Sequence, residues 1–257
     1  QKFTFAAMTP SEFDPSSTNL PITAVIDDVK QKLSESNTLI VNAPPGAGKS
    51  TVLPLTLCDE PWLEGKKIIM LEPRRLAARS IATRMSELLD DGIGNTICFR
   101  IRVEKKTSSK NRIEVRTEGI LPRLIQSDNA LEDVGMVIFD EFHERSIHAD
   151  VALALCREAQ QVLRPDLRIV IMSATLDMPT LTELLQCPVV VSQGRQHPVE
   201  VKYAGEVDKK MMPEMAARTI VTASKQHDGD ILAFFPGQGE IKRCEEILRR
   251  QLPNFRI

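Results

Sequence analysis

The sequence has 257 residues, of which 42% are hydrophobic and 26% are charged, and its formal net charge is −2 at pH 7. These values are typical of a globular protein with material for one large or two modest domains. No run of about 18 apolar residues occurs, so we expect no membrane-spanning helix. Because the overall charge is slightly negative, any contact with nucleic acid must use a local basic surface.

The five cysteines are scattered along the chain and include no C-x-x-C pair (Cys58, Cys98, Cys156, Cys187 and Cys244). An odd, dispersed set is typical of reduced thiols and does not suggest a disulfide framework or a zinc site. We therefore expect a cytoplasmic protein.

Residues 1–18 are rich in Ser, Thr, Pro and Phe, and their apolar residues show no regular spacing. They lack the basic and continuous apolar segments of a signal peptide, so we expect a flexible leader. Apolar residues then recur on one helical face over residues 21–33, which predicts a helix.

Residues 38–51 combine an apolar strand, a loop of small residues and a helix-like segment. This order is that of a phosphate-binding P-loop, although Ala43 replaces the first Gly of the pattern G-x-x-x-x-G-K-[ST]. Glycines let backbone N–H groups surround phosphate oxygens, the lysine reaches the β- and γ-phosphates, and the next hydroxyl binds Mg²⁺. An ordinary glycine turn would not need a lysine here. The predicted nucleotide-binding residues are Pro45, Gly46, Ala47, Gly48, Lys49, Ser50 and Thr51, with Ser50 also on the metal.

Apolar strand-like runs alternate with helical segments of about 10–15 residues along most of the chain. The expected strands are residues 67–71, 96–99, 113–116, 134–139, 167–172 and 189–191. This alternation predicts an α/β fold, with a parallel sheet and helices on both of its faces. Polar motifs follow several of these strands, and ligands of such sheets bind at that edge.

The sequence also predicts how the chain is divided. We expect a first domain over residues 19–192, a linker over residues 193–198 and a second α/β unit over residues 199–257. In that unit, strands are expected at residues 199–203 and 231–235. Because roughly 60 residues are too few for a finished domain of this kind, we expect the truncated beginning of a second domain and a fragment of a longer protein.

Asp140 and Glu141 follow the apolar run of residues 136–139. In a P-loop protein such a pair has a direct use, because the first carboxylate can hold Mg²⁺ through its water shell and the second can polarise the attacking water. Taken alone, the two acids could also belong to an ordinary loop or a helix N-terminus. The P-loop upstream favours the catalytic interpretation.

Two basic segments are candidates for contact with nucleic acid. Arg74, Arg75 and Arg79 follow a predicted strand, and residues 100–123 carry eight basic against three acidic side chains, a local net charge of +5. Sequence-independent binding to a strand depends on such surfaces. A solvated helix face and a charged loop are the alternatives. Aromatic residues are few here, so we expect backbone contacts and no stacking platform.

Together these segments stand in the order of helicase motifs I, Ia, Ib, II and III. The matching residues are 43–51, 72–79, 117–119, 140–143 and 173–175. Over residues 20–252 the chain resembles the DEAH-box superfamily-two helicases, most closely their bacterial HrpB type. Phe142 replaces the alanine of the family name, and no match to motifs V and VI occurs before Ile257.

The resemblance implies a RecA-like P-loop NTPase followed by the beginning of a second RecA-like domain. Such an enzyme couples hydrolysis of ATP, with Mg²⁺, to translocation along RNA or to its unwinding. No glutamine motif for adenine is evident, so other nucleoside triphosphates would also be accepted. The implied partners are single-stranded RNA or partly duplex nucleic acid and the remaining helicase domains, and the implied fragment would be weakly active alone.

The resemblance also assigns catalytic roles. Lys49 and Glu141 would act on the phosphates and on the attacking water, and Asp140 would hold the metal with Ser50. His143 would sense the state of the nucleotide through motif III or the second domain.

Other roles lie farther from the reacting atoms. Ser173 and Thr175 would couple hydrolysis to domain movement, although a simple helix cap is the alternative for that segment. Arg84 would stack on the base of the nucleotide. The expected nucleic-acid contacts are Arg74, Arg75, Arg100, Arg102 and Thr117.

Two other function classes compete with the helicase. A small-molecule kinase would need an acceptor pocket and a lid, and Ser173 and Thr175 would then match motif III by coincidence. A nucleotide-gated interaction module would bind nucleotide without strand-dependent turnover. Stimulation of hydrolysis by RNA separates the helicase from both.

Overall fold

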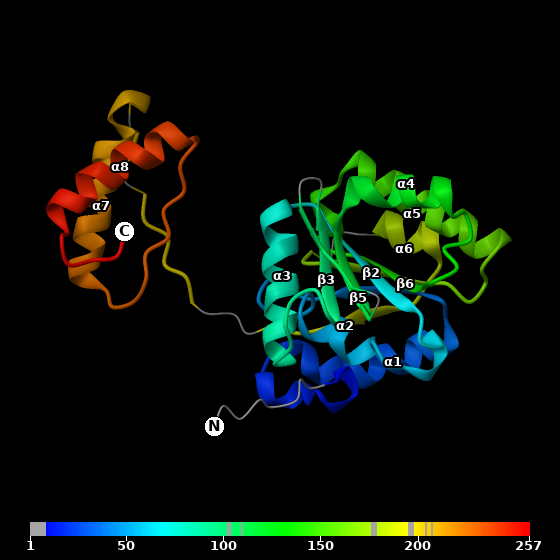
Figure 1. Cartoon of the computed structure of the whole chain (residues 1–257). Coiled ribbons are helices and arrows are strands. Elements are labelled where there is room, and N and C mark those ends of the chain that lie inside the picture. Colours follow the sequence, from blue (N-terminus) through cyan, green and yellow to red (C-terminus); the bar gives the residue numbers. More distant parts are fainter. Residues whose placement is uncertain are drawn as a thin grey trace, which may run out of the picture. The chain divides into compact units, whose positions relative to one another are not determined.

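The computed structural model describes residues 9–101, 104–108, 110–175, 179–194, 198–203, 205–206 and 208–257. The chain divides into two compact units, Gln1–Gln196 and His197–Ile257, and each is described by itself (Figure 1). The division falls within the predicted linker, residues 193–198.

An eight-stranded sheet forms the centre of the first unit, in the spatial order β4-β3-β5-β2-β6-β7-β1-β8. Its strands are β1 (Thr38–Asn42), β2 (Lys67–Glu72), β3 (Ile97–Ile101), β4 (Glu104–Lys106), β5 (Ile113–Thr117), β6 (Val134–Phe139), β7 (Arg168–Ser173) and β8 (Val189–Val191). Neighbouring strands are parallel except β3 and β4, which are antiparallel. Strands β1, β6 and β7 are buried along their whole length, which explains their nearly continuous apolar sequences.

Helices cover both faces of this sheet (Figure 1). One hydrophobic core contains residues of α1 (Ile26–Glu35), α2 (Val52–Leu57) and α3 (Arg75–Leu88). The other contains residues of α4 (Leu121–Ser127), α5 (Ile147–Val162) and α6 (Pro179–Leu185). Successive residues of a strand point to opposite faces, and in β2 Ile68 and Met70 join the first core while Ile69 and Leu71 join the second. The predicted α/β fold is confirmed.

Residues 10–18 differ from the predicted flexible leader. They form two 3-10 turns, Pro10–Glu12 and Pro15–Thr18, and Phe13 between them is buried in the first core. The predicted helix over residues 21–33 also begins differently, because a 3-10 turn, Pro21–Val25, precedes α1. Burial of one large aromatic ring can order a segment that shows no apolar periodicity.

The sequence also predicts reduced cysteines and no membrane-spanning helix. All five cysteines are free thiols, and four of them are buried. Burial raises the pKa of the Cys156 thiol to about 12, which makes it unreactive. None of the described helices has the length and apolar character needed to cross a lipid bilayer.

The α-helices among the described residues of the second unit are α7 (Met212–Gln226) and α8 (Gln238–Gln251), which pack through Ala217, Cys244 and Leu248. The strands expected at residues 199–203 and 231–235 are not formed, because these segments pair with no other strand among the described residues. An isolated strand leaves its backbone hydrogen-bonding groups unpaired, so the apolar pattern alone does not produce one.

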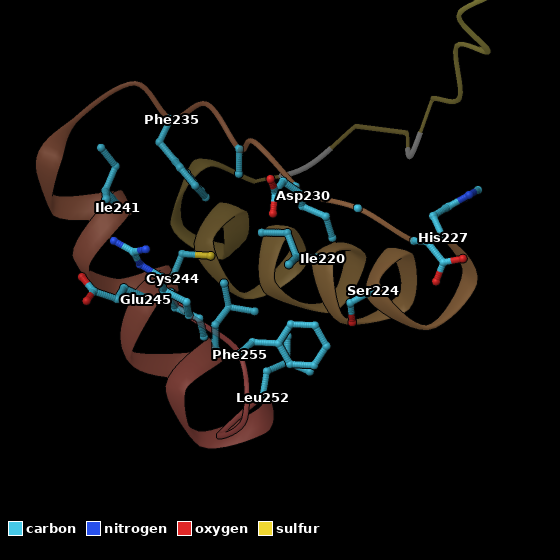
Figure 2. A pocket seen from close by; sticks show the side chains of 17 residues that line it. Ile220, Ser224, His227, Asp230, Phe235, Ile241, Cys244, Glu245, Leu252 and Phe255 are labelled. Atoms are coloured by element: carbon cyan, nitrogen blue, oxygen red, sulfur yellow. The ribbon is translucent and has the colours of Figure 1, made fainter. Parts of the chain in front are cut away.

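An open hollow lies against α7 and α8, lined by apolar residues such as Ile220, Phe235 and Leu252 and by polar ones such as Asp230 and Glu245 (Figure 2). No described strand covers this side of the two helices. The apolar residues of the unpaired segment, such as Leu232 and Phe234, are correspondingly exposed.

Gly135 at the start of β6 tests how closely this strand packs against Leu63 and Lys66. A Cβ at this position would lie 2.6 Å from Cδ2 of Leu63 and 3.1 Å from Cβ of Lys66. We expect Gly135→Ala to lower the free energy of unfolding by about 1–3 kcal/mol because the core must shift. Gly119→Ala, where nothing lies within 4 Å of the added atom, is the control. Equal midpoints in urea denaturation of the two variants would contradict this packing.

Candidate functional site

The P-loop connects β1 to α2 and depends on two glycines with left-handed backbones. Gly46 has a φ of 76° and Gly48 a φ of 92°, values that residues with a Cβ rarely adopt. A Cβ at Gly48 would also lie 2.9 Å from Cδ1 of Leu20 and 3.1 Å from Cγ2 of Ile22. The N–H of Ile22 donates to the carbonyl of Ala47 at 2.9 Å. Leu20 and Ile22 therefore brace the loop, a role that no motif in the sequence indicates.

Lys49 is the buried cation of this loop. Its side chain is 4% exposed, and its Nζ lies 2.7 Å from Oε1 of Glu141. The two residues are 92 positions apart in the sequence, so the fold brings together two of the three predicted catalytic groups. A buried ammonium needs a counter-charge, and Glu141 supplies it here.

Asp140 follows β6 directly and is almost fully buried. Burial raises its pKa to about 6, although the Ser50 hydroxyl and the Lys49 ammonium act in the opposite direction. Its Oδ1 accepts the N–H of Glu141 at 2.9 Å, whereas Oδ2 has no hydrogen-bond partner among the described residues. An unpaired carboxylate oxygen beside a hydroxyl fits Mg²⁺, which prefers oxygen ligands.

The described residues include no group of three His, Cys, Asp or Glu side chains that could hold a metal ion. A magnesium ion at Asp140 and Ser50 would therefore depend largely on water and phosphate oxygens for its other ligands. That mode of binding is common for Mg²⁺, which keeps several waters and is held by one or two carboxylates.

Glu72 ends β2 and is a third buried acid of the site. Burial and the nearby charge of Asp140 raise its pKa to about 8, so the side chain is mostly neutral at pH 7. Its Oε1 accepts the N–H of Arg74 at 3.3 Å. Glu72 thus fixes the entry to α3 without adding a full negative charge beside Asp140 and Glu141.

A 3-10 turn, Phe142–Glu144, follows Glu141 and places His143. Phe142 is buried, and its ring packs edge-on against Phe139 at 6.0 Å between centroids. Nδ1 of His143 accepts the N–H of Ala174 at 3.4 Å. The same nitrogen lies 3.4 Å from Oε2 of Glu141, so the imidazole lies between Glu141 and the segment after β7.

The segment after β7 is hydrogen-bonded to the beginning of the P-loop. Oγ of Ser173 accepts the N–H of Thr175 at 3.3 Å, and Nδ2 of Asn42 donates to the carbonyl of Thr175 at 2.9 Å. The N–H of Ala43 donates to the carbonyl of Ser173 at 3.0 Å. The two predicted coupling residues therefore lie beside the nucleotide loop.

A groove of about 770 Å³ lies where β2, β3 and β5 end, and three predicted nucleic-acid contacts line it: Arg75, Arg100 and Thr117. Lys105 and Arg123 add positive charge to the same groove, while Glu104 and Glu118 also line it. Arg102 lies outside the described residues. Arg74 is not among the described residues of the lining, and its guanidinium is paired with Glu144.

The basic stretch of residues 100–123 is less available than its sequence suggests. Arg116 is buried and donates to both carboxylate oxygens of Glu114, at 2.8 and 2.9 Å. Arg100 also lies 2.9 Å from Glu114, and Arg112 lies 3.3 Å from Asp59. Counting charges along the sequence overestimates the surface charge, because these arginines pair with acids, among them the buried Glu114.

Arg84 lies late in α3, where Nη1 is 3.1 Å from Oε2 of Glu87. More than half of its side chain is exposed. The predicted stacking of Arg84 on a nucleotide base stays a prediction.

Comparison with known proteins relates this site to a family. A family model described as DEAD/DEAH box helicase matches residues 23–184. The chain is 46% identical over 235 residues to ATP-dependent RNA helicase HrpB of Escherichia coli (strain K12), covering 91% of this chain and 29% of that protein. It is 30% identical over 236 residues to the ATP-dependent RNA helicase HrpA homolog of Haemophilus influenzae (strain ATCC 51907 / DSM 11121 / KW20 / Rd), covering 91% and 18%.

Solved structures agree with this relationship. The crystal structure of Escherichia coli DEAH/RHA helicase HrpB matches with a TM-score of 0.84 and 45% identity, over 91% of this chain and 30% of that chain. A structure of E. coli DExH-box NTPase HrpB matches with a TM-score of 0.74 and 46% identity, over 90% and 29%. The chain thus spans less than a third of the length of these relatives. Since the family model also covers more than half of the chain, the resemblance is confirmed, and the chain belongs to the DEAD/DEAH box helicase family.

Proposed function

We propose that this chain is the ATP-binding part of an ATP-dependent RNA helicase that acts in the cytoplasm and couples hydrolysis of Mg–ATP to translocation along RNA or its unwinding. The observation that carries the proposal is the buried Lys49–Glu141 pair beside the unpaired carboxylate oxygen of Asp140. The names of two relatives, both ATP-dependent RNA helicases, support the reaction and its substrate.

In this proposal the nucleotide phosphates take the place of Glu141 as the partner of Lys49. The P-loop N–H groups and Lys49 hold the β- and γ-phosphates, and Glu141, once released from Lys49, orients and polarises the attacking water. Asp140 and Ser50 would hold Mg²⁺, which neutralises charge on the phosphate oxygens. The ion pair between Lys49 and Glu141 holds the two proposed catalytic groups together.

His143, Ser173 and Thr175 are positioned to transmit the state of the nucleotide. His143 contacts the backbone of Ala174, and Ser173 is bonded to the start of the P-loop. Loss of a phosphate at Lys49 would therefore act on the end of β7 through two contacts, that of His143 with Ala174 and that of Ala43 with Ser173. Residues 199–257 are proposed as the beginning of a second RecA-like domain, and motifs V and VI would lie in the remaining helicase domains.

RNA would cross the groove formed by Arg75, Arg100 and Thr117, since these side chains offer donors to phosphate oxygens. The described lining residues of the groove include the imidazole of His148 but no Phe, Tyr or Trp side chain. We therefore propose contacts to the backbone of a single strand, with little reading of its bases.

Lys49→Ala tests the nucleotide site. We expect the affinity for Mg–ATP to fall on the order of 100-fold or more, because a buried cation facing the phosphates is removed. Isothermal titration of the full-length protein measures this affinity. Lys32→Ala, which removes a lysine paired with Asp28 on α1, is the matched control. An unchanged affinity in Lys49→Ala would rule out the phosphate-binding role.

Glu141→Gln tests the assignment of the base. We expect hydrolysis to fall by roughly 10²–10⁴-fold because the amide cannot accept a proton, while nucleotide binding is kept or tightened because Lys49 loses a competing partner. Single-turnover hydrolysis and titration with Mg–ATP separate the two effects. Glu158→Gln, an exposed acid on α5, is the control. Hydrolysis at the wild-type rate in Glu141→Gln would mean that another group activates water.

Replacing both Arg75 and Arg100 with Ala tests the groove. Each lost phosphate contact should lower the log–log salt dependence of binding by roughly 0.7 for a single strand, and two unrelated single-stranded RNAs should lose affinity by similar factors. Fluorescence anisotropy at several salt concentrations measures both, with Lys32→Ala as the control. A loss confined to one of the two sequences would indicate base recognition instead, and no loss would remove the groove from the RNA path.

A further inference from the structure

The four residues after Asp140 contact three separate parts of the site. Glu141 pairs with Lys49 of the P-loop, His143 accepts from Ala174 after β7, and Glu144 pairs with Arg74 at the start of α3. Glu141, His143 and Glu144 belong to one short turn, so a movement of one of them shifts the backbone that carries the other two.

Arg74 is held at both its backbone and its side chain. Its N–H donates to Glu72, and its guanidinium Nη2 donates to Oε1 of Glu144. The Arg74 side chain is nevertheless 70% exposed, against 31% for Glu144. Its neighbour Arg75 lines the basic groove. Arg74 thus lies beside the groove as an accessible cation that is already occupied by a carboxylate of the turn.

We propose that Glu144 is a positioning residue that competes with a nucleic-acid phosphate for Arg74. This inference rests on the proposed function, because it requires a strand that passes the groove. A guanidinium binds a carboxylate and a phosphate with the same planar set of donors, so the two partners exclude each other at one edge of Arg74. When a phosphate takes Arg74, Glu144 is released, and the turn that begins beside Glu141 loses one restraint.

The Arg74–Glu144 pair is expected to contribute little to the stability of the fold. Exposed ion pairs contribute little to stability because both ions are well solvated. The turn is already fixed by the burial of Phe142 and its edge-on contact with Phe139. The pair can therefore open without unfolding the turn, which is what an exchangeable contact requires.

The test measures RNA binding by the full-length protein without nucleotide, using a labelled single-stranded RNA in fluorescence anisotropy. We expect Glu144→Gln to tighten binding roughly two- to five-fold, the range that loss of a competing exposed pair allows, and to leave the melting temperature nearly unchanged. Arg74→Ala should weaken binding, and adding Glu144→Gln to Arg74→Ala should have no further effect. Glu87→Gln removes the same charge from another exposed Arg–Glu pair on α3 and should not tighten binding.

The outcomes separate this inference from the function on which it rests. If the wild-type protein does not bind the RNA, the proposed function fails. If it binds but Glu144→Gln leaves the affinity unchanged, weakens it, or tightens it no more than Glu87→Gln does, competition for Arg74 is overturned. Equal tightening by Glu144→Gln with and without Arg74 would overturn it too, since the effect would then come from charge alone.

Discussion

The need of the buried Lys49 ammonium for a negative partner organises this site. In the chain as described the partner is Glu141, which lies beyond β6. Lys49 follows β1, and β7 alone separates β1 from β6 in the sheet. Two strand spacings amount to roughly 10 Å, a distance that a loop and two side chains can bridge. The sheet order therefore decides that these residues meet, and a phosphate bound by Lys49, as we propose, would compete with the Glu141 carboxylate.

The carboxyl groups at the ends of β2 and β6 differ in their charge at pH 7. Glu72, Asp140 and Glu141 converge where β2 and β6 end, and burial keeps the pKa of Glu72 at about 8 and that of Asp140 at about 6. Because Glu72 is mostly neutral at pH 7, the negative charge beside the Lys49 ammonium comes from Asp140 and Glu141. The same electrostatics explain why Glu72 can serve as a neutral hydrogen-bond acceptor for the backbone of Arg74.

Much of this arrangement could be predicted from the sequence because its signals are local. The glycines, Lys49 and the acid pair lie in short motifs, and β1, β6 and β7 are continuous apolar runs. The α/β fold was predicted correctly on that basis. The expectation of strands at residues 199–203 and 231–235 was wrong, because pairing depends on a neighbouring strand that apolar composition cannot report. Phe13, which orders residues 10–18, stands in a segment without any pattern.

The features that the sequence does not predict depend on contacts between residues far apart in the chain. The bracing of Gly48 by Leu20 and Ile22 joins residues whose proximity depends on the folded chain. The pairing of Arg116 with Glu114 hides a charge that the sequence counts as basic surface. The Arg74–Glu144 contact likewise spans 70 positions. Motifs therefore predict the chemistry, while the partners that restrain each motif residue are evident only from the fold.

The central claim is that nucleotide hydrolysis at Lys49 and Glu141 responds to a nucleic-acid strand in the groove of Arg75 and Arg100. Steady-state ATP hydrolysis by the full-length protein, measured with and without single-stranded RNA, tests it most directly. The account predicts that RNA raises the rate, and that replacing Arg75 and Arg100 with Ala raises the RNA concentration needed for half-maximal stimulation. Hydrolysis that proceeds at the same rate with and without RNA would contradict it.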